Sequence, residues 1–167
     1  MAIMPLVMTR LTMTLIIPLM ACGPLTQSGS EPEPDSGSET VQLTIGHRSE
    51  WRELWLEGET NLPNGAYVNY RVTHDLARTA QVKDWPAKNL MEAGRSAVLD
   101  GTYWARINTL HWPAGQVTVL VQFPLPPQSP EIVQRYGEFG EHMAGEHVTM
   151  RQGIKALEVT HTFDHRP

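Results

Sequence analysis

Apolar and polar side chains alternate with a period of two in the second half of the chain. Val117, Val119, Val121 and Phe123 share one face of residues 116–123, and a similar pattern places Leu157, Val159, His161 and Phe163 on one face of residues 154–164. Such alternation is typical of strands with one buried face. Further strands are predicted at 41–45, 53–57, 67–72, 96–99 and 102–107. About seven strands in residues 41–167 predict an all-β fold, an antiparallel β-sandwich.

Turn signals separate these strands. Asn64-Gly65 and Asp100-Gly101 tolerate the positive φ angles of tight turns, so each predicts a hairpin between the strands on either side. A third turn at 112–115 leads into the strand at 116–123. One short helix is predicted near 130–136, with Ser129 as N-cap, Pro130 in the first turn and Gly137 as the stop. Residues 76–94 remain ambiguous, since 86–93 fits either a short helix or an irregular strand.

The order of strands and turns between residues 52 and 124 resembles that of immunoglobulin-like or transthyretin-like modules of bacterial surface proteins. The resemblance depends on the turn punctuation, and the cysteine pair of true immunoglobulin domains is absent. It implies a fold and no particular activity, because such folds host many unrelated functions.

The N-terminal segment has the order of a secretory signal. In residues 1–21 a single charge, Arg10, precedes an apolar run from Leu11 to Met20. A membrane-spanning helix needs about twenty apolar residues, and this run is about half as long. The stretch before Arg10 is also apolar, which leaves open whether translation begins at Met1 or Met8.

Leu19-Met20-Ala21-Cys22 resembles the lipobox of bacterial lipoproteins, with a departure at Met20, where a small residue is more common. The resemblance implies cleavage before Cys22, the only cysteine, and a diacylglycerol on its sulfur. Two or more acyl chains hold a protein firmly to a bilayer. The chain is therefore expected to cross the plasma membrane and be anchored to the bacterial cell envelope, on a membrane that the sequence does not specify. The alternative is an ordinary signal peptide with a chance cysteine.

Charge divides the remaining chain into two parts. Residues 22–40 are rich in Ser, Gly, Pro and acidic residues, which predicts a disordered tether before a domain at 41–167. The tether holds four of the eighteen acidic residues and no base, so the domain has fourteen acids against twelve of the thirteen Lys and Arg residues. A nearly neutral domain without a basic stripe argues against a nucleic-acid partner.

Seven histidines are the main candidates for chemistry. His142 and His147 lie near several glutamates in the segment 138–147, which could gather around zinc or a similar cation, or could form a solvated loop. His161 and His165 are about 13 Å apart in an extended strand, too far for one ion. GxSxG, SxxK and phosphate-binding glycine motifs are absent from the sequence, so neither a catalytic residue nor a cofactor is predicted.

Trp55 and Trp104 are the candidate binding surface. Trp104 falls on the face opposite Tyr103, so if Tyr103 faces the core, Trp104 is exposed or covered by another sheet. Exposed tryptophans bind sugars or protein partners, although core packing is the alternative. The sequence therefore predicts a lipid-anchored binding or assembly module that is not an enzyme. Two alternatives stay open: a small metal-dependent or hydrolytic enzyme using the 138–147 loop, and a purely structural spacer.

Overall fold

The structure, a computed structural model, describes residues 37–78 and 89–166. Within this part there are ten strands and one α-helix, which confirms the prediction of an all-β fold with one short helix. In chain order the elements are β1 (Glu39–Thr40), β2 (Gly46–Glu50), β3 (Glu53–Glu59), β4 (Tyr67–His74), the 3₁₀ helix η1 (Asp75–Arg78), β5 (Met91–Ala97), β6 (Thr102–Asn108), β7 (Gly115–Phe123), α1 (Pro130–Tyr136), β8 (Met143–Ala144), β9 (Val148–Arg151) and β10 (Ile154–His165). The lipobox with Cys22, most of the predicted tether and residues 79–88 lie outside the described residues.

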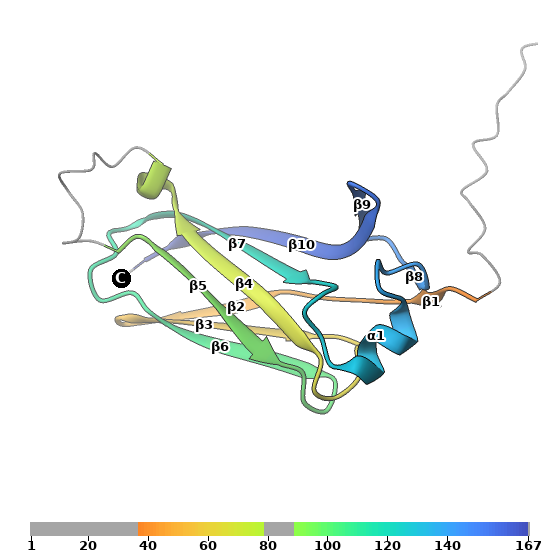
Figure 1. Cartoon of the computed structure of the whole chain (residues 1–167). Coiled ribbons are helices and arrows are strands. Elements are labelled where there is room, and N and C mark those ends of the chain that lie inside the picture. The colour runs from red at the N-terminus through yellow and green to blue at the C-terminus, as the bar shows by residue number, and fades with distance from the viewer. Residues whose placement is uncertain (1–36, 79–88, 167) are drawn as a thin grey trace, which may run out of the picture. The chain divides into compact units, whose positions relative to one another are not determined.

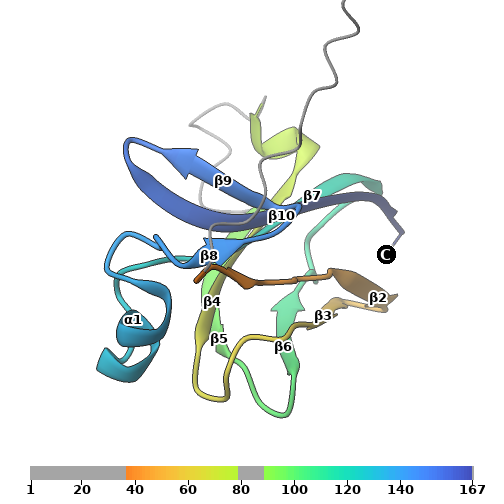
Figure 2. The same ribbon diagram turned by 90° about the vertical axis from the view of Figure 1, so that its right-hand side faces the viewer.

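The strands form two antiparallel sheets and one short parallel pair. The larger sheet has the order β5-β4-β7-β10-β9, the smaller one has the order β2-β3-β6, and β1 pairs with β8 in parallel. Figures 1 and 2 show the smaller sheet facing the larger one, with α1, β1 and β8 together at one end. One apolar cluster includes side chains from both sheets, among them Leu54, Leu56, Val68, Val119 and Ile107.

The faces predicted for β7 and β10 are confirmed. Val119 lies opposite His161 and Val121 lies opposite Val159, and the inward valines of β7 are fully buried. On the other side of the same strands, the hydroxyls of Thr118 and Thr162 are 3.3 Å apart and exposed. The register therefore directs one face of this strand pair toward the core, where the β7 side chains and Leu157 are buried and Val159, His161 and Phe163 are half-buried.

The two turns predicted as hairpins connect different sheets instead. Asn64-Gly65 links β3 to β4, and Asp100-Gly101 links β5 to β6, so neither turn joins neighbouring strands of one sheet, although Asp100-Gly101 closes an isolated antiparallel bridge between Leu99 and Thr102. The backbone conformations are as expected, with positive φ at Gly65, Asp100 and Gly101. The turns also contact each other, because the backbone N–H of Asp100 donates to Oδ1 of Asn64 at 2.8 Å. A turn dipeptide fixes a local reversal, whereas long-range packing decides which sheet the next strand joins.

Several predicted boundaries are wrong. Residues 41–45 contain only an isolated bridge from Leu43 to Thr60, and the strand predicted at 96–99 ends at Ala97 and begins at Met91. Strands β2, β8 and β9 were not predicted. The helix is confirmed at Pro130–Tyr136, but the side chain of Ser129 makes no capping hydrogen bond.

Glu39 and Thr40, which the sequence assigns to the tether, form β1 and pair with Met143 and Ala144 of β8. The carboxylate of Glu39 accepts two hydrogen bonds from Arg135 on α1, and the one from Nε measures 2.7 Å. The segment that precedes the sheets is thus attached at the α1 end of the domain.

Candidate binding face on the three-stranded sheet

The solvent-facing side of β2, β3 and β6 carries Trp55 between two arginines. The strand register sets Arg48 and Arg106 directly opposite Trp55, one on each neighbouring strand. Their guanidinium carbons lie 5.5 and 5.7 Å from the Trp55 ring centroid, within the range of cation–π attraction. The neighbouring residues Leu54 and Leu56 point into the core, so the period of two in β3 presents Trp55 outward.

Trp104 lies beside Trp55 on the same face. The two rings are 5.9 Å apart at an angle of 34°, and Trp104 is 62% exposed, whereas Trp55 is half-buried. Tyr103 is buried, so the expected alternation in β6 is confirmed and Trp104 is exposed. The backbone around Trp104 is fixed, since its carbonyl accepts a hydrogen bond from the Ser96 hydroxyl at 2.7 Å. The face thus presents an aromatic side chain on a rigid main chain.

Acidic groups pair with both arginines. Arg48 forms an ion pair with Glu50, and Arg106 forms one with Glu53. The hydrogen bond from Arg106 is the main reason why the pKa of Glu53 lies below its usual value. Both arginines are therefore paired, and Glu57 and Glu59 add further carboxylates, so the face offers hydrogen-bond donors and acceptors around the two indoles.

An open groove of about 620 Å³ lies over this face, lined by residues that include Thr44, Arg48, Trp55, Glu57 and Trp104. A second hollow of about 370 Å³ shares Thr44, Glu59 and Thr102 with it, so the two adjoin. The second hollow is lined only by polar side chains and Gly101. Both hollows together form a polar surface with the indoles in one part of it.

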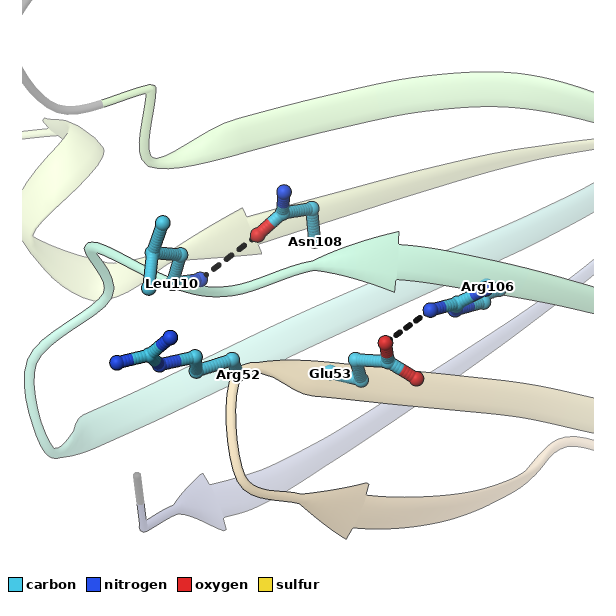
Figure 3. A pocket seen from close by; sticks show the side chains of 5 residues that line it. All are labelled: Arg52, Glu53, Arg106, Asn108 and Leu110. Carbon is cyan, nitrogen blue, oxygen red and sulfur yellow. Dashed lines mark hydrogen bonds and ion pairs between the residues drawn. The ribbon is translucent and has the colours of Figure 1, made fainter.

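A third hollow of about 330 Å³ lies near the β2–β3 turn (Figure 3). Glu53 and Arg106 point toward each other at its side, and the backbone N–H of Leu110 donates to Oδ1 of Asn108 at 2.9 Å. Arg52, which also lines it, extends from the turn between β2 and β3. This hollow shares no lining residue with the groove but adjoins the Arg106 side of Trp55.

A further exposed indole, Trp51, lies in the turn between β2 and β3. It is 71% exposed, and the guanidinium carbon of Arg52 is 3.5 Å from its ring centroid. Arg52 has a φ of 69°, which closes the tight turn. Trp51 does not line the groove, so it offers a comparison for the tryptophans that do.

The segment 138–147, where the sequence suggested a metal site, is held by backbone interactions. His142 and His147 are both exposed, and Nδ1 of His142 lies 3.3 Å from the carbonyl oxygen of Arg135. The carboxylate of Glu141 accepts a hydrogen bond from the Phe139 N–H at 3.1 Å. In residues 37–78 and 89–166, no group of three or more His, Cys, Asp or Glu side chains is arranged to hold a metal ion.

Sequence reasoning missed two pairs of histidines that the fold brings together. Nδ1 of His47 lies 2.9 Å from Nε2 of His161, and the buried residues His74 and His165 both contact the Trp112 ring. Each pair joins residues that are far apart in the chain. Their only signal in the sequence is the histidine count, which does not show which rings meet.

No protein family, curated protein or solved structure matches this chain. The described part of the chain has no helix with the length and apolar character that crossing a bilayer requires.

Proposed function

We propose that this chain is a lipid-anchored protein of the bacterial cell envelope whose domain binds a glycan strand on the outer face of β2, β3 and β6. The observation that carries the proposal is the pair Trp55 and Trp104, which lie side by side on the solvent side of a sheet, above a groove of about 620 Å³. The proposal keeps the binding-module function predicted from the sequence and adds a candidate surface and a ligand class to it.

The chemistry of the groove favours a sugar. A pyranose ring presents C–H groups on its faces and hydroxyls around its edge, so it suits an aromatic surface bordered by polar groups. Trp104 supplies the exposed ring, and Glu57 lies directly opposite it on β3. Arg48 and the adjoining polar hollow supply donors and acceptors for the hydroxyls of a sugar. A protein partner would instead favour a more apolar, closely packed centre.

The envelope location is proposed from the sequence. A single cysteine follows an apolar run of signal length, and the lipobox resemblance implies that the mature chain begins at Cys22. A glycan ligand fits that location, since the cell envelope is rich in polysaccharide.

The glycan proposal is tested by co-sedimentation of the full chain, carrying Cys22→Ser, with insoluble peptidoglycan, chitin and cellulose. Saturable binding to at least one of them is expected, and Trp104→Ala should weaken it at least about tenfold. Trp51→Ala is the matched control, because Trp51 is the more exposed indole and lies outside the groove. Equal loss in both variants, or retention of binding in Trp104→Ala, contradicts the proposal. If the chain captures an envelope protein through Trp104 and binds no glycan, the glycan-binding proposal is wrong and the face binds protein instead.

The lipid anchor is tested separately by labelling cells with palmitate. Label is expected on the native chain and absent from Cys22→Ser, and the native chain should sediment with membranes. Continued labelling of Cys22→Ser excludes the anchor but leaves the glycan experiment unaffected.

A further inference from the structure

His47 and His161 face each other across the gap between the two sheets. His47 belongs to β2, an edge strand of the smaller sheet, and His161 belongs to β10 of the larger sheet. Nδ1 of His47 lies 2.9 Å from Nε2 of His161, although the two residues are 114 positions apart. Both rings are half-buried, so they remain accessible to a small ion.

We propose that His47 and His161 bind a divalent transition-metal ion, of the zinc, nickel or copper class, which links the two sheets. Imidazole nitrogen is a preferred ligand for these ions, and two histidines leave the remaining coordination positions to water. The site is distinct from His142 and His147, and it does not depend on the glycan proposal.

The spacing of the two nitrogens suits this role. Zinc–nitrogen bonds of 2.0–2.1 Å at a tetrahedral angle place two nitrogens about 3.3 Å apart. The observed distance of 2.9 Å therefore has to increase by only about 0.4 Å, which small side-chain rotations provide. In the metal-free pair one of the facing nitrogens carries the proton. Moving this proton to the far nitrogen of the same ring frees both lone pairs without a net release of protons.

Phe163 orients the His47 ring. The two rings stack with centroids 3.6 Å apart and an angle of 14°, and in this orientation Nδ1 of His47 faces Nε2 of His161.

The experiment uses the full chain without a histidine tag, carrying Cys22→Ser so that no thiol competes for metal. Calorimetric titration with Zn²⁺ and Ni²⁺ should show one ion per chain, and Mg²⁺ should give no heat. At one hundred times the dissociation constant, the bound ion should raise Tm by about 5–10 °C. His47→Asn and His161→Asn should each weaken binding at least tenfold, whereas the double variant His142→Asn/His147→Asn should retain it.

Two measurements keep the test informative if a variant is less stable. Circular dichroism and Tm without metal establish that each variant is folded before titration. In the Cys22→Ser chain with all histidines intact, Cu²⁺ should selectively broaden the NMR signals of the His47 and His161 rings. Absence of a saturable heat, or unchanged affinity in His47→Asn, overturns the proposal. Loss of binding in the His142/His147 control, or broadening centred on other histidines, also overturns it.

Discussion

Tyr103 occupies the space above Gly58, the residue directly opposite it on the neighbouring strand. A β-carbon at Gly58 would lie 2.5 Å from the Tyr103 hydroxyl oxygen and 2.1 Å from the carbonyl oxygen of Thr44. That hydroxyl donates a hydrogen bond to the same carbonyl at 2.5 Å, and burial raises the pKa of Tyr103. The absence of a side chain at residue 58 thus allows a buried phenol to reach a polar partner.

We therefore expect Gly58→Ala to destabilise the domain by about 2–3 kcal/mol, because the methyl group must displace Tyr103 or the backbone. Gly46→Ala is the control, since a β-carbon there meets its nearest atom at 3.4 Å. Urea denaturation of both variants measures the difference. Equal stability of the two variants would show that the sheet adapts to a side chain at residue 58.

The strand faces could be predicted from the sequence because period-two alternation is a local property. It correctly oriented the valines of β7, and it set Trp104 opposite Tyr103 on β6. The same reasoning could not predict that β3 pairs with β2 and β6, since a turn such as Asn64-Gly65 does not specify the sheet that the next strand joins.

The candidate sites were predictable only in part, for the same reason. Trp55 was identified from the sequence, but its position between Arg48 and Arg106 follows from the register of three strands. His47 and His161 meet through pairing and packing over a separation of 114 residues. Local patterns such as alternation and turn dipeptides do not show such a long-range register.

Lys155 organises the loop that follows α1. Its ammonium donates to the carbonyl oxygens of Glu141 at 3.0 Å and Met143 at 2.9 Å. Lys155→Met keeps much of the apolar stem and removes both hydrogen bonds, so we expect a loss of about 1–2 kcal/mol. Amide hydrogen exchange should become faster in residues 137–144 and stay unchanged in β7. Unchanged exchange in the loop would show that the backbone hydrogen bonds suffice to hold it.

Arg135 and Glu39 provide a pH-dependent link between α1 and β1. The hydrogen bond from Arg135 lowers the pKa of Glu39, although burial partly opposes this effect. A carboxyl whose pKa is lowered on folding stabilises the folded state above its unfolded pKa, and this contribution is lost as the pH falls through the folded pKa. Because both side chains are more than one third exposed, Arg135→Met should cost at most about 1 kcal/mol at pH 7.

The Arg135→Met effect should decrease as the pH falls through the lowered pKa of Glu39, and it should shrink in 1 M salt. Urea denaturation at pH 7 and at a series of lower pH values measures it. A double-mutant cycle with Glu39→Gln supplies the control, since it isolates the pair from the contact between Arg135 and the Tyr136 ring. A cost that stays the same throughout this pH series would assign the effect to this packing contact.

His165 should make the domain less stable in mild acid. The residue is 1% exposed, and neither of its ring nitrogens has a hydrogen-bond partner within residues 37–78 and 89–166. Burial, and secondly the proximity of His74, lowers its pKa. The unfolded chain therefore binds more protons than the folded chain at a pH between the folded pKa and about 6.5. Stability should be complete above pH 6.5 and fall as the pH decreases through this window.

Replacing His165 with leucine isolates this contribution. His165→Leu removes two unpaired polar atoms from the interior, so at pH 7.5 it should be neutral or stabilising. Its loss of stability between pH 7.5 and pH 5 should be smaller than that of the native chain, because leucine has no proton to bind on unfolding. His111→Gln should retain the native pH dependence. Urea denaturation followed by tryptophan fluorescence measures all three chains, because Trp112 lies 6.2 Å from the His165 ring. If His165→Leu and the native chain lose stability equally in acid, His165 is not the cause of that loss. The candidate is then His47, whose pKa is also lowered.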